Sequence, residues 1–443
     1  MSLDKPPLQG SWVSSDRPVP RRLARPLRSF LATEAAGGIV LLAATLVALI
    51  WVNSPWDASY ARLWETSAGF RIGNFEVVES LQHWVNDGLM TIFFFVVGLE
   101  IKRELVAGEL NNARKAALPA IAAAGGVLVP AAIYAALNAG GEGSAGWGIP
   151  MATDIAFAVG LIALLGRRCP PALKVFLLSL AIVDDIIAIV VIALFYAGDL
   201  SMGWLSLALV ALGSVPLLKR LRVRWTPIYV VLGSFAWLAM LESGVHATIA
   251  GVALGLLTPA LPFDPAGAED AIATAGNLAD DPNPVDLRAT VVQANEVVPV
   301  AERLQHLLHP WSSYVIVPIF ALANTGVVLS ADAIGDALSS RVTLGIVLGL
   351  VLGKIAGITA ASWLAVRGGV GALPDDVTWG HLVGASAVAG IGFTVSLFVA
   401  ELAFTDARLI SEAKIGILGA SILATLLGAA FLRRADSSPE YER

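Results

Sequence analysis

The chain carries little charge for its length. Of its 443 residues, 14% are Asp, Glu, Lys or Arg, whereas a soluble globular domain carries about 25%. Apolar residues make up 56% of the chain, and the mean hydropathy is +0.74. This composition excludes an ordinary soluble protein and indicates a protein that crosses a membrane several times.

Cysteine is almost absent, and so is any sign of a cleaved leader. The one cysteine, Cys169, excludes an intrachain disulfide. The first apolar run, from Leu31 to Val52, is a full span long and lacks a convincing small-residue cleavage site. The net charge of −6 carries no information about partners. We expect no cofactor and no nucleic-acid partner, and we expect the lipid bilayer to surround most of the chain.

Twelve apolar runs are long enough, or nearly so, to cross a bilayer as helices. Several are shorter than about 20 residues, which suits broken or tilted helices. We therefore expect an all-α polytopic membrane domain over residues 31–432, between an N-terminal tail, 1–30, and a C-terminal tail, 433–443. The expected spans are 31–52, 81–101, 117–139, 149–166, 172–196, 201–218, 226–242, 244–260, 309–329, 343–366, 381–404 and 412–432.

The basic residues give this arrangement an orientation. If the spans alternate, 23 of the 29 Lys and Arg residues fall on one side and 5 on the other, while Lys354 lies inside a span. Cytoplasmic segments collect Lys and Arg. The pattern predicts a multi-pass membrane protein with both termini in the cytoplasm.

Two segments outside the spans are distinctive. Short alternating runs around the Gly-containing turn Ser67–Gly69 predict an outer β-hairpin over about residues 61–78. An isolated hairpin is marginally stable, so it packs either on a second copy of the chain, which makes a homodimer, or on its own domain. The cytoplasmic segment 259–302 has eight acidic residues against Arg288 alone. Its proline-rich composition predicts a solvated linker with a short helix around Val285–Val297, rather than a regulatory element.

Adjacent aspartates, Asp184 and Asp185, lie in the apolar run from Val175 to Tyr196. A carboxylate near the bilayer centre costs about 2.5 to 3.5 kcal/mol on insertion scales, so such residues usually mark a functional cavity. Neighbours on a helix point about 100° apart, which gives the two side chains different surroundings. We expect one to face a water-filled cavity and the other to meet a partner on a neighbouring helix.

Two further apolar stretches are interrupted. Pro150 and small polar residues break the run before Asp154, and Gly390, Gly392 and Thr394 break the eleventh span. Broken helices are tolerated in a membrane where they line a cavity or pack on protein, and a pair of them in the two halves of a transporter indicates its binding site. At the break, Asp154 would lie where a helix N-terminus concentrates positive charge.

A lone lysine, Lys354, is central in the tenth span, where it needs a carboxylate or helix C-terminal carbonyls. Any one of these residues could be a structural charge or a kink, but the whole set on separate spans favours function. Three acids and one base leave a negative site, and Na⁺ and H⁺ compete for the same carboxylate oxygens. A site that holds either ion and opens alternately to each side is an antiporter.

Eight collinear motifs resemble the NhaA family of bacterial Na⁺/H⁺ antiporters. The resemblance runs from about residue 35 to 432 and leaves out most of 259–300. The motifs are NSPWDASYARLWET, VNDGLMTIFFFVVGLEIKREL, ATDIAFAVG, AIVDDIIAI, SGVHATIAG, HPWSSYVIVPIFALANTGV, LGKIAGI and AGIGFTVSLF.

The resemblance implies twelve transmembrane helices with inverted repeats, in which the fourth and eleventh cross as broken helices. It implies an electrogenic exchange of Na⁺ or Li⁺ for protons, serving pH and sodium homeostasis. It assigns the ion-binding role to Asp185 with Asp184, Asp154 and Thr153, and charge compensation to Lys354. Na⁺ itself would bind at Asp185 and Asp154.

The resemblance also implies a cytoplasmic funnel linked to pH response, lined by Glu100, Glu104, His306 and His309. This sequence departs from the family pattern there, because Gln305 and Glu302 stand where Glu and Lys are common.

Two other classes of membrane protein are alternatives that fit the sequence less well. An intramembrane aspartyl protease needs carboxylates on facing helices, which adjacent aspartates cannot supply. A passive channel would use rings of carbonyls or charges from symmetric subunits, in which a buried lysine has no role.

Overall fold

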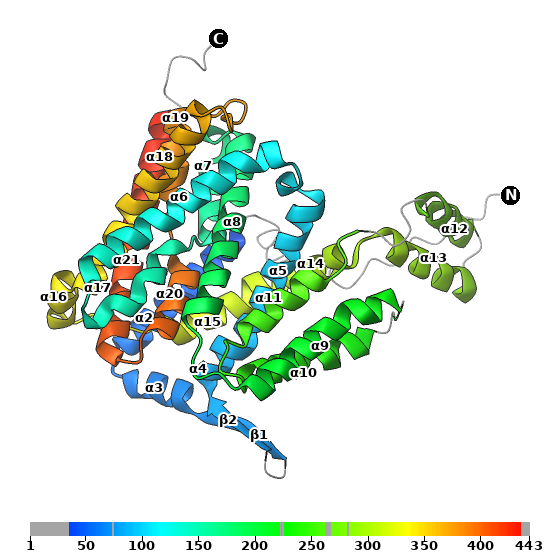
Figure 1. The fold of residues 1–443 in the computed structure, drawn as a ribbon, viewed down its shortest axis with the longest axis horizontal. Coiled ribbons are helices and arrows are strands. Elements are labelled where there is room, and N and C mark those ends of the chain that lie inside the picture. The colour runs from blue at the N-terminus through cyan, green and yellow to red at the C-terminus, as the bar shows by residue number, and fades with distance from the viewer. Residues whose placement is uncertain are drawn as a thin grey trace, which may run out of the picture.

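The computed structural model describes residues 35–72, 75–221, 223, 226–261, 267–280 and 283–435. The expected N-terminal tail and most of the C-terminal tail lie outside these residues. The described chain is mostly helical (Figure 1).

In the first part of the described chain, up to α11, most residues lie in helices. They are α2 (Ala36–Val52), α3 (Asp57–Glu65), α4 (Leu81–His83), α5 (Met90–Ala107), α6 (Ala113–Asn138), α7 (Ile155–Leu165), α8 (Pro171–Phe195), α9 (Met202–Arg220), α10 (Thr226–Leu241) and α11 (Thr248–Leu257). A π-helical turn, η3 (Trp84–Leu89), joins α4 to α5, and a 3-10 segment, η5 (Glu142–Met151), precedes α7.

The second half is built in the same way from helices with local irregularities. Its elements are α12 (Ala268–Asp280), α13 (Pro284–Val297), α14 (Val300–Trp311), η7 (Ser312–Ile316), α15 (Val317–Asn324), α16 (Ala331–Ser339), α17 (Arg341–Leu348), η8 (Gly349–Gly353), α18 (Lys354–Arg367), α19 (Trp379–Val388), α20 (Phe393–Ala403) and α21 (Ala407–Ala435). The π-helical segments η7 and η8 continue the helices on either side of them.

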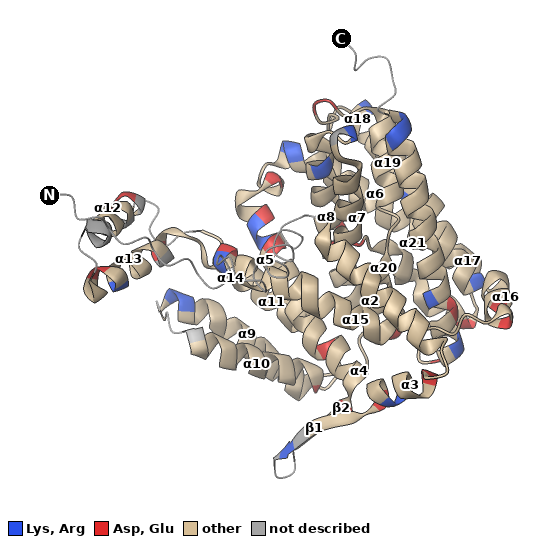
Figure 2. Ribbon diagram, turned by 180° about the vertical axis from the view of Figure 1, so that it is seen from behind, with Lys and Arg blue, Asp and Glu red and all other residues tan. Residues whose placement is uncertain are grey.

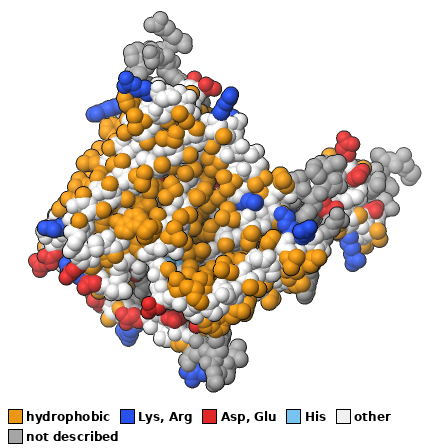
Figure 3. Space-filling model, viewed as in Figure 1, with side chains coloured by type: hydrophobic (Ala, Val, Ile, Leu, Met, Phe, Trp, Pro, Cys, Tyr) orange, Lys and Arg blue, Asp and Glu red, His pale blue; other side chains and the backbone are white. Residues whose placement is uncertain are grey.

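Six described helices are long and apolar enough to cross a membrane, and nine are if each of three bent helix pairs is counted as one span. Twelve spans therefore remain a prediction. Charged residues lie mostly toward the ends of the helical body and leave its middle largely uncharged (Figure 2). One face of the body presents a broad apolar surface (Figure 3), which suits contact with lipid.

The small antiparallel sheet pairs β1 (Ser67–Ile72) with β2 (Phe75–Ser80) and projects from the body (Figure 1). The sequence predicts a hairpin here, which the structure has, but the predicted position of its turn, Ser67–Gly69, is wrong. Those residues belong to β1, with Gly69 opposite Val78, and the strands separate only after the pair Ile72 and Phe75. Gly69 instead permits a close approach, because a Cβ there would lie 2.0 Å from the Val77 carbonyl oxygen.

The helices form two groups around separate apolar cores. The larger core includes residues of α2, α5, α6, α8, α15 and α17–α21, and the smaller one is formed by α9, α10 and α11. Glycines bring α5 and α11 into close contact, since a Cβ on Gly98 would lie 2.7 Å from the Val252 carbonyl oxygen. The interrupted segments and the buried aspartates belong to the larger group.

In segment 259–302, α13 lies where a short helix was expected, and α12 is an additional helix. Asn283 caps α13 by accepting from the backbone N–H groups of Val285 and Asp286.

Candidate ion-binding site

Two helical paths are interrupted at the centre of the larger group. The path from η5 to α7 bends by 43° at residues 152–154, and the path from α19 to α20 bends by 45° at residues 389–392. The breaks lie against each other. The backbone N–H of Asp154 donates to the Ile391 carbonyl oxygen at 2.6 Å. The Ser396 hydroxyl donates to the Ile149 carbonyl oxygen at 2.8 Å.

Glycines allow this close packing. A Cβ on Gly390 would lie 2.3 Å from the Leu350 carbonyl oxygen, and one on Gly392 would lie 2.3 Å from the Ser396 hydroxyl. Pro150 packs against Gly349 of η8, where a Cβ would approach the proline ring to 2.8 Å. The backbones of three segments, η5, η8 and the 389–392 break, therefore meet where a side chain would not fit.

The Asp154 carboxylate accepts hydrogen bonds from the N-terminal ends of α7 and α20, the two helices that follow the breaks. Its Oδ1 accepts from the Phe157 N–H of α7 at 3.1 Å. Its Oδ2 accepts from both the N–H and the hydroxyl of Thr394 on α20, at 3.0 and 2.6 Å. A buried carboxylate in this position balances the positive ends of two helix dipoles.

Lys354 lies at the C-terminal end of η5, where free carbonyl groups make the helix end negative. Its ammonium group donates to the Met151 carbonyl oxygen at the end of η5, and lies 2.5 Å from Asp184 Oδ2 and 3.2 Å from Thr153 Oγ1. The Thr153 hydroxyl lies 2.8 Å from Asp184 Oδ2 and 2.9 Å from the Ala389 carbonyl oxygen, so its one proton can serve either acceptor. Lys354, Thr153 and Asp184 thus tie both breaks to α8.

Asp185, one residue further along α8, has different surroundings. Lys354 and Asp184 are fully buried, whereas Asp185 retains 6% exposure. Among the described residues, its Oδ1 is buried without a hydrogen-bond partner. Glu100 and Asp154 are close enough to Asp185 to interact with it electrostatically. Asp185 is therefore a nearly buried carboxylate whose Oδ1 has no hydrogen-bond donor in the part of the chain that the structure describes.

The available ligands are oxygens. Asp184 Oδ1 is also buried without a partner, and the Asp154 carboxylate and Thr153 hydroxyl lie at the same breaks. Within the described ranges, no three His, Cys, Asp or Glu side chains are grouped as a resident metal site would require. Few carboxylates supplemented by hydroxyl, backbone and water oxygens suit a hard monovalent ion that must also leave.

The residues expected at the cytoplasmic funnel lie on two packed helices. Glu100 and Glu104 are on α5, while His306 and His309 are exposed on α14, which packs along α5. Glu104 accepts from the Glu109 backbone N–H at 3.1 Å, so it ties the last turns of α5 to the segment that follows. Gln305 is half-buried, and its side-chain carbonyl oxygen has no hydrogen-bond partner in the described structure.

Several contacts at the breaks were not anticipated from the sequence. The acceptors at Ile149, Met151, Ala389 and Ile391 are backbone carbonyls, which carry no residue-specific signal. Ser396 could have been noticed, because it lies one helical turn after Gly392.

A second buried ion pair, between Glu401 and Lys414 at 2.7 Å, joins α20 to α21.

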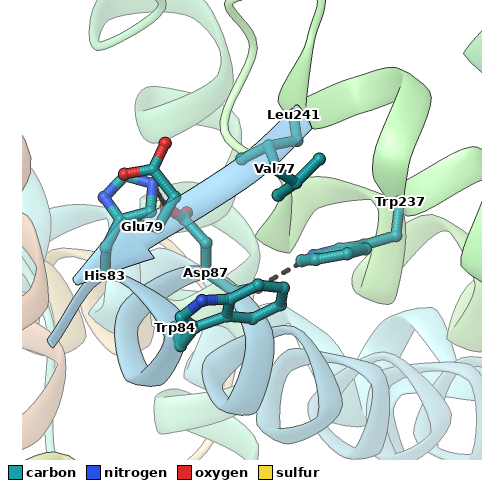
Figure 4. Close-up of a pocket in the computed structure, with 7 residues that line it drawn as sticks. All are labelled: Val77, Glu79, His83, Trp84, Asp87, Trp237 and Leu241. Carbon is teal, nitrogen blue, oxygen red and sulfur yellow. Dashed lines mark hydrogen bonds and ion pairs between the residues drawn. The ribbon is translucent and has the colours of Figure 1, made fainter. Parts of the chain in front are cut away.

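A pocket lies at the root of the hairpin, apart from these carboxylates (Figure 4). Val77, Glu79, His83, Trp84, Asp87, Trp237 and Leu241 line it. His83 Nε2 lies 2.8 Å from Asp87 Oδ2, and the Trp237 indole N–H donates to the Asp87 carbonyl oxygen at 2.9 Å. This pocket joins the hairpin to α10 and shares no residue with the ion-binding candidates.

Comparison with known proteins decides the family. The family model described as Na⁺/H⁺ antiporter 1 matches residues 28–432. The chain belongs to this family. It is 48% identical over 412 residues to Na(+)/H(+) antiporter NhaA 3 of Frankia alni, covering 93% of this chain and 89% of the relative. It is 47% identical over 433 residues to Na(+)/H(+) antiporter NhaA 2 of Sorangium cellulosum, covering 95% and 92%.

The family resemblance drawn from the eight motifs is confirmed. As a member of the Na⁺/H⁺ antiporter 1 family, the chain is a multi-pass membrane transporter, which favours transport over the protease alternative. The roles of individual residues are a separate matter, and they rest on the geometry described above.

Proposed function

We propose that the protein exchanges Na⁺, or Li⁺, for protons across the bacterial inner membrane. The observation that carries this proposal is the contrast between the two adjacent aspartates. Both keep an Oδ1 without a hydrogen-bond partner among the described residues, but Asp184 is fully buried with its Oδ2 committed to Lys354 and Thr153, whereas Asp185 retains some exposure. The relatives' names, which specify Na⁺/H⁺ antiport, support the same exchange.

Exchange follows from competition at Asp185. Burial disfavours a bare carboxylate charge, so either a proton or a cation must neutralise it. The two ions contend for the same oxygens, and a site loaded with one excludes the other. Asp154 and Thr153 supply further oxygen ligands beside it.

Alternating access requires the site to be reached from each side in turn. The two breaks supply a flexible centre, and Asp154 and Lys354 neutralise the half-helix ends that meet there. We propose that these are the fourth and eleventh spans of a twelve-helix fold with inverted repeats. The matched bends of 43° and 45° support this reading.

The exchange is proposed to be electrogenic, carrying more protons inward than Na⁺ ions outward, and so to serve pH and sodium homeostasis. With several titratable groups at one cation site, more than one proton can be taken up as one cation leaves. Both termini are proposed to be cytoplasmic, on the basis of the basic-residue asymmetry.

A homodimer through the outer hairpin is proposed as the working assembly. The hairpin projects from the body, and Val78 is exposed on it. Its root is nevertheless anchored on its own chain, because the Trp84 indole donates to the Ala68 carbonyl oxygen at 2.7 Å and Val77 is buried. We therefore propose that the root of the hairpin packs on its own chain and that the part beyond the root packs on a second copy.

The proposal is tested by flux measurements in proteoliposomes. Addition of Na⁺ should collapse an imposed pH difference, even with the membrane potential clamped, and Asp185→Asn should abolish this response. Asparagine keeps the shape and one oxygen but loses the charge and the titratable proton. Asp332→Asn, the same change at an exposed position on α16, should leave exchange intact. Uncoupled cation conductance, or coupled exchange surviving in folded Asp185→Asn, would refute the assignment.

A further inference from the structure

The helices α12 and α13 form a pair that stands apart from the helical body, at its edge (Figures 1 and 2). They pack on each other, and α13 is followed within three residues by α14, which lies along α5. The pair is therefore attached directly to the helix that bears His306 and His309.

The surface of this pair is both apolar and acidic. Val285 is 74% exposed, and Leu287 and Val291, one turn apart on α13, are each 52% exposed. On α12, Ile272 is 73% exposed. The surrounding segment 259–302 has a formal charge of −7, from eight acidic residues and Arg288. Apolar side chains held open among acidic ones suit an occupant that is basic and amphipathic.

We propose that this surface binds the protein's own N-terminal tail, residues 1–34. The tail has six basic residues against three acidic ones, and apolar residues Leu23, Leu27 and Phe30 recur every three or four positions among its arginines. Other occupants fit less well. A second copy of α12–α13 would repel this one, and the anionic cytoplasmic leaflet repels acidic helices.

The tail begins within reach of the surface. Gly37 lies against Ser313, just after the end of α14, and Gly160 lies against Ala35. The 12 residues of α14 span about 18 Å at the helical rise, which is the distance back toward α13. For comparison, a random coil of 34 residues would have a root-mean-square length of about 30 Å. A tethered tail of this length acts at an effective concentration of about millimolar.

Docking would change the field at the cytoplasmic side. The bare acidic pair concentrates cations near α14 and α5, and a bound basic tail cancels that effect. The docked tail therefore raises the Na⁺ concentration needed for half-maximal exchange, a consequence that rests on the proposed function, whereas the contact itself does not.

The contact is tested by cross-linking in the full-length protein. In a Cys169→Ser background, Arg25→Cys combined with Val291→Cys should cross-link in membranes at low ionic strength, and about 1 M salt should suppress the product. Arg25→Cys with Asn112→Cys, an exposed position between α5 and α6, is the matched control and should not cross-link. Equal cross-linking to both positions would overturn the proposal.

Charge reversal separates a specific contact from membrane binding. Changing Arg21, Arg22 and Arg28 to Glu should reduce the Arg25–Val291 cross-link about fivefold and lower the half-saturating Na⁺ concentration about two- to threefold at low salt. Adding Asp280→Lys and Glu296→Lys, at the C-terminal ends of α12 and α13 where the helix dipole favours lysine, should restore both. Cross-linking that follows the anionic lipid content of proteoliposomes, and is indifferent to these acids, would refute docking on α12–α13. Absence of exchange in every variant would count against the proposed function, while the cross-link would still decide the docking.

Discussion

At the residue scale, adjacent carboxylates on one helix have separate surroundings because of helical geometry. Asp184 Oδ2 meets Lys354 and Thr153, whereas Asp185 Oδ1 has no partner among the described residues. The sequence was sufficient to single out both aspartates and Lys354, since buried charges in an apolar chain are conspicuous. It could not show that Lys354 also binds the Met151 carbonyl, because that contact depends on where another segment of the chain lies.

Removing either member of the buried pair should destabilise the fold. Lys354→Ala leaves Asp184 and the carbonyl of Met151 without their donor, and breaking a buried pair costs about 3 to 5 kcal/mol. Thermal unfolding in detergent should show a lower midpoint for Lys354→Ala and for Asp184→Asn. The double variant Asp184→Asn with Lys354→Gln should recover part of the loss. Additive effects, with no coupling between the two sites, would show that the pair is not a thermodynamic unit.

At the element scale, the helix breaks were visible in the sequence, but their mutual packing was not. Pro150, Gly390 and Gly392 marked interruptions, and the structure shows that they also make room for neighbouring backbones. The hairpin shows the limit of local signals. The sequence predicts a turn at Gly69, whereas Gly69 is a strand residue that allows close approach to Val77. The helix α12 was missed because acidic, proline-bounded segments are typical of loops as well as of short exposed helices.

Close approach at the second break predicts a cost for any side chain there. Gly390→Ala should lower stability by about 1 to 3 kcal/mol, because the new methyl group meets the Leu350 carbonyl oxygen. Gly419→Ala on α21 is the matched control, since a Cβ there meets nothing within 4 Å. Thermal unfolding of the two variants side by side checks this. A Gly390→Ala protein as stable as the control would mean that the break relaxes freely.

The hairpin predicts an effect on assembly without an effect on chemistry. Ser67 and Ser80 are paired at its base, so residues 68–79 can be replaced by a two-residue Gly-Ser link that preserves α3 and α4. The shortened protein should dimerise more weakly, while exchange per protomer persists, because the buried carboxylates lie elsewhere. Size-exclusion chromatography with light scattering over a dilution series measures this. A dimer of unchanged affinity would exclude the hairpin as the interface.

At the scale of the whole molecule, the account makes exchange a competition between two ions for one buried site. Sequence composition and the eight motifs were enough to predict the family, and helical content follows from a chain that must satisfy its backbone within a membrane. The number of membrane spans could not be predicted from the sequence as firmly as the family. Several helices are short, bent or interrupted by π-helical turns, so neither length nor hydropathy alone delimits them.

The most direct test is the pH profile of exchange at several Na⁺ concentrations. If a single proton competes with Na⁺ at Asp185, the pH of half-maximal activity should move toward acid by about one unit for each tenfold rise in Na⁺. Gln305→Glu should alter this profile only modestly, because it adds a titrating group on α14 rather than at the carboxylates. Proton release and uptake in proteoliposomes, with the pH fixed on both sides, supply the measurement. A profile that stays in place whatever the Na⁺ concentration would contradict competition at Asp185 and would show that a separate group controls the response to pH.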